Sequence, residues 1–313
     1  MSAIVKACFV ANTIQNTGKE CDVSMAATAM LIAVPKSLTF DDTDLEDPVQ
    51  WLNGLLHAAK PQRAYIVFGQ QAPIRALTNN KENDVLVTLD DGSTVFLRYG
   101  FFNRMFETTS GGLDYAKKLQ SLNKSGYSII EIDNEGKMLV HDNGDGTYSG
   151  FVNDLMYSPS PILADFKSTP YKNQFYLSYS PKEIVQNGLI LAGANQLLAL
   201  QGLIDAKIVS KAAGTTGTLT IGVETLLAET DLVALFGSAL ANVANFVVTE
   251  VDNGTVVVPT SAAIVGGNIV LSKAAGFTSG KSYSVAGAAP SVWLAALIDG
   301  YDASQNPTVI TIP

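Results

Sequence analysis

The chain of 313 residues contains two histidines, His57 and His141. Histidine is the side chain used most often for acid–base catalysis near neutral pH. His57 falls inside a predicted helix, five positions after Leu52, and is interpreted as a helix-face residue, whereas His141 adjoins an acidic turn. The sequence also lacks the G-x-S-x-G and G-x-x-x-x-G-K-[ST] elements of serine hydrolases and phosphate-binding loops. We therefore predict that the chain is not an enzyme and has no catalytic residues.

Neighbouring acidic residues are the other group that could do chemistry. Asp133 and Glu135 could form the carboxylate pair of a glycosidase, yet they stand in a predicted turn. Residues 142–147 offer Asp and Asn oxygens to a calcium ion, but an EF-hand needs such oxygens at loop positions three and five, where Gly144 and Gly146 stand. A plain hairpin turn explains this loop, because Asn and Gly adopt positive φ readily. The sequence therefore predicts no metal site and no cofactor.

Two sets of residues are candidates for contacts with a partner. An acidic loop could dock a lysine of a neighbouring molecule, although a solvated loop is the simpler interpretation. A cluster of aromatic and arginine side chains has the composition of an interface, and packing in the core of the first domain is its alternative. The acidic loop comprises Asp41, Asp42, Asp44 and Glu46, and the aromatic cluster comprises Arg98, Tyr99, Phe101, Phe102, Arg104 and Phe106.

Charge argues against nucleic-acid binding. The formal net charge is −9, and the only arginines are Arg63, Arg75, Arg98 and Arg104. A nucleic-acid binder needs clustered Lys and Arg to release counterions from phosphates, whereas an acidic surface lets DNA pass without sticking. A hydrophobic fraction of 47% suggests additional buried surface of the kind that an oligomer interface supplies.

Neither a membrane span nor a secretory signal is predicted. The apolar segment 25–35 is far too short to cross a bilayer, and Asn12 and Thr13 interrupt the apolar stretch near the N-terminus. We therefore expect a soluble product made in a cytoplasm. The cysteines Cys8 and Cys21 could pair, but free thiols are favoured, so their redox state is left open.

Residues 1–205 are predicted to form an α+β domain with hairpins and two helices, the first of which has Asp47 as its cap and Pro48 at its first position. Residues 69–83 and 102–113 are expected to be long loops that become ordered only against neighbouring molecules. The predicted helices are 47–60 and 113–124, with a short one at 181–187; the predicted strands are 64–68, 127–132, 137–140, 148–153 and 174–179, with a hairpin at 84–99 that turns at Asp90, Asp91 and Gly92.

Residues 206–313 are predicted to form a β-sandwich. Short alternating runs are separated by turn residues every 8 to 12 positions or so, which is typical of that architecture. Leu219, Ile221 and Val223 mark one such run, and a helical patch at 229–243 is expected to have Thr230 as its N-cap. The fold class is therefore mainly β.

The C-terminal part resembles bacterial Ig-like domains, which are modular spacers or decorations. The resemblance covers residues 215–313 and implies an immunoglobulin-like sandwich. Its three strand motifs are D-x-G-x-x-V (Asp252, Gly254, Val257), V-x-G-x-x-V-L (Val265, Gly267, Val270, Leu271) and G-x-x-Y-x-V (Gly280, Tyr283, Val285).

Residues 85–190 are similar to virion structural proteins of tailed phages. The similarity rests on a K-x-L-x-S-x-N helix from Lys117 to Asn123, a strand ending in Ile132-Asp133, a turn at Gly136, and a D-G-x-x-x-G-F segment from Asp145 to Phe151. It implies a subunit of the tail tube, built in the host cytoplasm and located in the virion. The partners would be copies of itself in stacked rings or hexamers, other virion proteins, and DNA that passes without specific binding. A capsid shell or capsid decoration protein and an adhesive surface-binding module are the alternatives.

Overall fold

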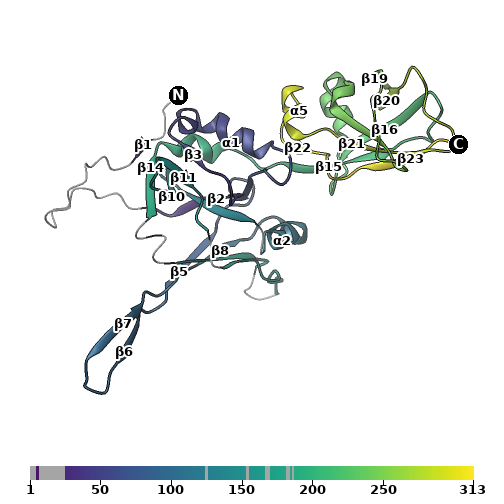
Figure 1. Ribbon diagram of the computed structural model, residues 1–313. Coiled ribbons are helices and arrows are strands. Elements are labelled where there is room, and N and C mark those ends of the chain that lie inside the picture. Colours follow the sequence, from purple (N-terminus) through teal and green to yellow (C-terminus); the bar gives the residue numbers. More distant parts are fainter. Residues whose placement is uncertain are drawn as a thin grey trace. The chain divides into compact units, whose positions relative to one another are not determined.

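The computed structural model describes residues 5–6, 25–123, 126–152, 155–165, 170–180, 184 and 187–313. Strands account for 42% and helices for 17%, which confirms the predicted mainly-β class. The chain divides into two compact units (Figure 1), the first formed by residues 1–56 and 61–201 and the second by residues 57–60 and 202–313. Cys8 and Cys21, whose redox state the sequence leaves open, and most of the predicted helix 181–187 lie outside the described residues.

The first unit is built mainly from antiparallel strands. Its strands are β1 (Val5–Lys6), β2 (Thr28–Pro35), β3 (Phe40–Asp41), β4 (Tyr65–Phe68), β5 (Ala76–Lys81), β6 (Val85–Thr88), β7 (Thr94–Arg98), β8 (Phe102–Thr108), β9 (Tyr127–Asp133), β10 (Lys137–Asp142), β11 (Thr147–Ser149), β12 (Leu155–Tyr157), β13 (Asn173–Tyr179) and β14 (Gly188–Ala192). Its helices are α1 (Pro48–Leu56) and α2 (Gly112–Ser121), with 3-10 turns η1 (Asp44–Glu46) and η2 (Ala194–Ala199).

The central sheet of this unit has the order β1-β14-β10-β9-β2-β4, with β11 and β3 paired at the side of β10. Alternate side chains of β2 enter two different cores. Met30, Ile32 and Val34 pack with α1, whereas Leu31 and Ala33 face the opposite core. Because β2 is covered on both faces, nearly all of its side chains are apolar, as is usual for a central strand. This explains the apolar run in segment 25–35.

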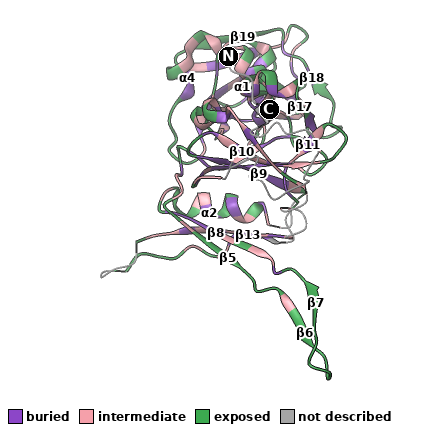
Figure 2. Cartoon of the chain, turned by 90° about the vertical axis from the view of Figure 1, so that its left-hand side faces the viewer, coloured by how far each residue is buried: buried purple, intermediate pink, exposed green. Residues whose placement is uncertain are grey.

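A second sheet, in the order β12-β13-β8-β5, forms the other layer of the first unit. Helix α2 lies between the two sheets (Figure 2), and its Leu119 is buried with Phe106 and Phe175 of the second sheet. Buried and half-buried residues alternate along β13, so one face of this sheet is fully covered and the described residues cover the other face only in part.

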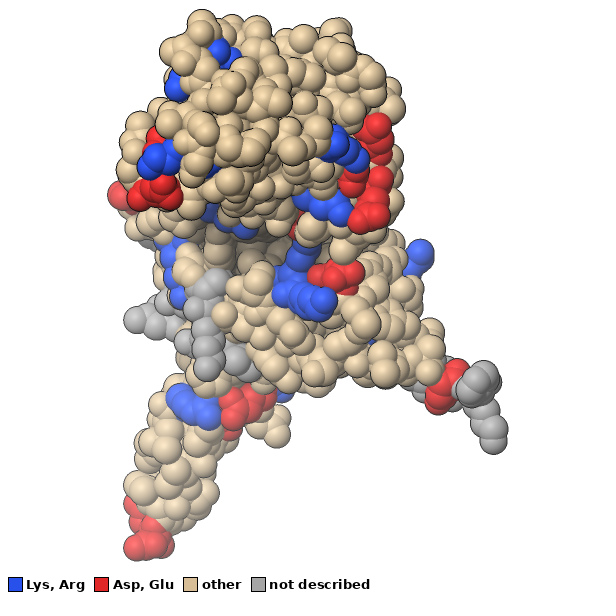
Figure 3. Space-filling view, turned by 90° about the vertical axis from the view of Figure 1, so that its right-hand side faces the viewer, with Lys and Arg blue, Asp and Glu red and all other residues tan. Residues whose placement is uncertain are grey.

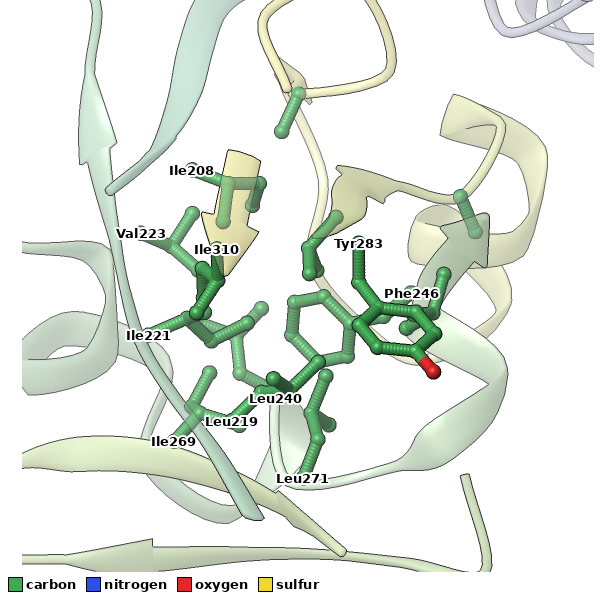
Figure 4. Close-up of a cluster of buried hydrophobic side chains, with 14 of the residues drawn as sticks. Ile208, Leu219, Ile221, Val223, Leu240, Phe246, Ile269, Leu271, Tyr283 and Ile310 are labelled. Atoms are coloured by element: carbon green, nitrogen blue, oxygen red, sulfur yellow. The ribbon is translucent and has the colours of Figure 1, made fainter. Parts of the chain in front are cut away.

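The second unit is a sandwich of two sheets, in the orders β19-β20-β16-β15-β22 and β18-β17-β21-β23. Leu219, Ile221 and Val223 point into its core together with Tyr283 (Figure 4). Trp293 is buried in the same core. Its elements are β15 (Ile204–Ser210), β16 (Thr218–Thr225), α4 (Leu232–Phe236), η3 (Gly237–Ala239), η4 (Val243–Asn245), β17 (Phe246–Glu250), β18 (Val256–Val257), β19 (Ser261–Val265), β20 (Asn268–Ser272), β21 (Ser282–Gly287), α5 (Pro290–Ala295), β22 (Tyr301–Asp302) and β23 (Thr308–Thr311).

Helix α5 ends in an unusual cap. The N–H of Ile298 donates to the carbonyl of Trp293 (2.8 Å) and the N–H of Leu297 donates to that of Leu294 (3.0 Å), which is the Schellman pattern. The residue in the left-handed position is Leu297, with φ of 64°, where glycine is usual. Its side chain is 83% exposed, so packing within the described residues does not explain this choice.

Several sequence predictions are wrong in detail. Segments 69–83 and 102–113 are not long loops, because they contain β5, β8 and the start of α2. Strand β5 has a polar sequence and is held by its ladder with β8, from Ala76 opposite Glu107 to Lys81 opposite Phe102. The helical patch at 229–243 is not one helix but the short α4 followed by the 3-10 turn η3, and Asp231, not Thr230, is the N-cap of α4.

Candidate interaction site

Strands β6 and β7 form a two-stranded hairpin that projects from the second sheet of the first unit (Figure 1). We call this hairpin, residues 85–98 with its turn, the arm. Asp91 accepts a hydrogen bond from the N–H of Ser93 (2.8 Å) and Gly92 has φ of 81°, so local turn chemistry closes the hairpin where the sequence predicts it. An isolated two-stranded hairpin is at best marginally stable in water, so the attachment of the arm to its sheet matters for its stability.

The arm is apolar on both faces. Leu86 pairs with Phe96 on one face, and Val87 pairs with Val95 on the other. The exposed apolar side chains here, each 39–58% exposed, are Leu86, Val87, Leu89, Val95, Phe96, Leu97 and Tyr99. Together they expose on the order of 500 Å² of apolar surface. The largest apolar patch of a typical monomer has about this area, and here it lies on one small element.

A charged region, which we call the root and which comprises Glu82, Asp84, Arg98 and Gly100, joins the arm to the sheet. Both nitrogens at the end of Arg98 donate to the carboxylate of Glu82, at 3.1 and 3.0 Å, and this pairing holds the pKa of Glu82 below its usual value. The N–H of Gly100 donates to Asp84 (2.9 Å) and lowers the pKa of that carboxyl group. A Cβ atom at Gly100 would overlap the carbonyl oxygen of Glu82, so the chain can pass here only with glycine.

Beneath the root, a buried ion pair connects the two sheets. Arg104 of β8 donates to the fully buried carboxylate of Glu131 in β9, and to the side-chain oxygens of Thr28 (3.0 Å) and Asn79 (2.9 Å). Tyr179 of β13 also donates to Glu131 (2.8 Å), and its own pKa is raised, mainly by burial and then by this carboxylate. Because Arg104 and Asn79 belong to the strands that continue into the arm, this cluster fixes the sheet from which the arm leaves.

The structure divides the predicted aromatic cluster between surface and core. Tyr99 is exposed beside the arm, and Phe101 lies under the guanidinium of Arg98, 5.2 Å from its carbon to the ring centre. Phe102 is half-buried. The interface interpretation is wrong for Phe106, which is fully buried in the core, and Arg104 is committed to Glu131, so the core alternative holds for these two.

The predicted acidic loop lies on the other sheet, apart from the root of the arm. Asp41 accepts from the N–H groups of Thr43 (2.8 Å) and Asp44 (3.2 Å), so it forms a local turn. Asp42 accepts from the buried Tyr148 (2.8 Å), and burial together with this bond raises the pKa of Tyr148 to about 12. Glu46 is exposed, and no described contact assigns it a partner.

His57 and Asp133, two of the residues considered for catalysis, have partners within the fold. Helix α1 ends before His57, which is a buried residue of the second unit with its Nε2 atom 3.1 Å from Asp299, so the helix-face interpretation is wrong. Asp133 accepts from the N–H groups of Glu135 (2.9 Å) and Lys137 (2.8 Å) in a turn. Within the described ranges, no group of His, Cys, Asp and Glu has the geometry of a metal site, and no helix is long and apolar enough to cross a membrane.

The hairpin 84–99 is predicted from the sequence, but its apolar surface on both faces is not. Alternation along the first strand places Val85, Val87 and Leu89 on one face, and Leu86 and Phe96 supply the other. The signal was present as consecutive apolar residues in both strands, a pattern typical of strands covered on two sides.

Comparison with models of known protein families gives no match, and no curated protein is significantly similar to the chain.

Proposed function

We propose that the chain is a structural subunit of a tailed-phage virion, and that it assembles with copies of itself into the tail tube. In this proposal DNA passes through the tube without specific binding, other virion proteins cap the assembly, and the second unit is a decoration that faces outward. The chain acts without catalysis or a cofactor.

The arm is the observation that carries the proposal. Its apolar side chains cover both faces and pack mainly against one another, as Phe96 does against Tyr99 with 4.5 Å between ring centres, so a monomer leaves each of them about half exposed to water. An exposed apolar patch of this size is often functional, and contact with another protein is one such function. A subunit that repeats such a contact in every copy gains stability only by assembling.

Two further features support the virion setting. The net charge of −9 suits a lumen that must not retain DNA, because repulsion keeps a polyanion moving. The mainly-β fold, with hairpins joined by short turns, agrees with the similarity of residues 85–190 to virion structural proteins.

The test is the assembly state of the purified full-length chain. We expect light scattering to show a large oligomer, and negative-stain microscopy to show rings or tubes. A variant with Leu86→Ser, Phe96→Ser and Leu97→Ser should remain monomeric, because these substitutions remove apolar area without touching the core. A wild-type chain that stays monomeric at high concentration overturns the proposal, and closed shells in place of tubes overturn its tail-tube part.

A further inference from the structure

The second sheet of the first unit has two different ends. The arm leaves from the end where Tyr179, Phe102 and Lys81 lie in register. The opposite end, where Asn173 pairs with Thr108, points the other way along the strands (Figure 2). We call this opposite end the receiving end.

Exposed apolar side chains gather at the receiving end. Ile162 pairs there with Lys172 through two backbone hydrogen bonds of 2.9 and 3.0 Å, and the neighbouring Leu163 is exposed. The side-chain nitrogen of Asn173 donates to the carbonyl of Gly112 (3.4 Å), which places the exposed Leu113 at the same end. Three large apolar side chains therefore face solvent beyond the end of the sheet.

The charges at the two ends are complementary. The N–H of Arg75 donates to the carbonyl of Glu107 (2.7 Å), so Arg75 lies at the receiving end, and its exposed guanidinium has no ion-pair partner among the described residues. Between Arg98, the last residue of β7, and the turn, the strands of the arm bear no charge, and the turn itself carries Asp90 and Asp91 (Figure 3). The exposed Asp165 and the ion pair of Lys172 with Glu107 (3.0 Å) also lie near this end, and Arg75 is the basic residue there for which the described residues provide no ion-pair partner.

We propose that the arm of one copy binds the receiving end of a second copy. The apolar strands pack on Leu113, Ile162 and Leu163, and the carboxylates of the turn meet Arg75. This inference rests on the proposed self-assembly and names the surface through which it occurs.

The area and the geometry both suit a second copy. If the surface that covers the arm equals the arm's apolar surface in area, one contact buries on the order of 1,000 Å², which reaches the lower limit for a biological interface. Each copy gives one arm and accepts one, so every subunit makes two such contacts. Contacts of this head-to-tail kind close into rings or extend as filaments, because the two binding surfaces differ.

Two half-competent variants test the direction of binding. The donor-deficient variant carries Leu86→Ser, Phe96→Ser and Leu97→Ser, and the receiver-deficient variant carries Leu163→Asp and Arg75→Glu. We expect each to be monomeric alone and the mixture to form a 1:1 dimer that grows no further, as measured by light scattering. Val258→Asp, an exposed substitution on the second unit, is the matched control and should assemble like the wild type. Far-UV circular dichroism verifies that each variant is folded.

A charge exchange tests the contact itself. Asp90→Lys with Asp91→Lys, or Arg75→Glu alone, should each weaken association about tenfold, because like charges then face each other. Both changes in one chain should restore association to near the wild-type value.

The outcomes separate the inference from the proposed function. A wild-type chain that never associates overturns both. A wild type that assembles while the receiver-deficient variant assembles equally well overturns the receiving end alone. A receiver-deficient variant that forms dimers by itself shows that arms pair with arms, which also overturns it.

Discussion

Replacing Arg104 with methionine should strongly destabilise the first unit and leave the second unchanged. The side chain of Arg104 is 17% exposed and that of its partner Glu131 is 0% exposed, so the substitution leaves a carboxylate buried without its counter-charge. Removing one member of a buried ion pair costs about 3–5 kcal/mol. With a urea dependence of about 2 kcal/mol per molar, the unfolding midpoint of the first unit should fall by about 2 M.

Arg98→Met is the matched control. Arg98 also pairs with a glutamate, Glu82, but the two side chains are 47% and 42% exposed. Exposed ion pairs contribute little to stability, so the midpoint should stay close to that of the wild type. The double variant Arg104→Met, Glu131→Gln should recover at least half of the loss, because the amide needs no counter-charge.

The two tryptophans make the assay specific to each unit. Trp51 belongs to the first unit and Trp293 to the second, so 5-fluorotryptophan gives one ¹⁹F resonance for the unfolding of each. Equal losses for Arg104→Met and Arg98→Met, or no recovery in the double variant, would refute the assignment of Arg104 to a structural ion pair. If Arg104→Met is as stable as the wild type but does not assemble, Arg104 is a residue of the interface.

Three further predictions follow from local geometry. Leu297→Gly should stabilise the second unit by up to about 0.5 kcal/mol, because relief of the left-handed backbone, worth about 1–2 kcal/mol, exceeds the entropy cost of glycine and the small loss of packing. Leu235→Gly, a similarly exposed leucine (59%) with helical backbone, should be destabilising, and urea unfolding that shows the same sign for both contradicts the cap assignment. Gly100→Ala should displace the arm by clashing with Glu82 while the core stays intact, so hydrogen exchange should quicken only at the root; unchanged exchange there contradicts the close approach. Burial of Glu107 is outweighed by hydrogen bonds from Gln174 and Lys172, so its pKa lies below 4.5 and its stabilising effect, present above that pH, is lost as the pH falls through the folded value. The difference in free energy of unfolding between the wild type and Glu107→Gln should therefore become smaller as the pH falls. A difference that does not change with pH contradicts this.

Local signals in the sequence were sufficient to predict the mainly-β class and many of the helices, strands and turns. Pro48 and the cap Asp47, whose carboxylate accepts from the N–H of Gln50 (3.2 Å), start α1 as expected. The turns at Asp91-Gly92 and at Asn143–Gly146 close hairpins where Asp, Asn and Gly satisfy the backbone at short range. Such features depend on a few neighbouring residues, so one sequence is sufficient to predict them.

The functional surface could be predicted only in part. Arg98, Tyr99 and Phe101 lie at the root of the arm, as candidates for a contact surface, but Phe106 of the same cluster belongs to the core. Composition does not separate these positions, since aromatic residues are favoured in both interfaces and cores. Which of them face solvent depends on where the ladder of β8 ends and the arm begins.

What the sequence determined by itself is thus the class of fold, its turns and its scarcity of histidine, all of which follow from residue type and short-range spacing. Tertiary structure alone decided that polar β5 is a strand, that β2 is covered on both faces, and that Arg104 finds Glu131 across 27 residues. It also decided that the apolar hairpin 85–98 projects from its sheet. Burial is a property of what lies beside a residue in space, and long-range pairing, which the order of residues along the chain does not display, sets those neighbours.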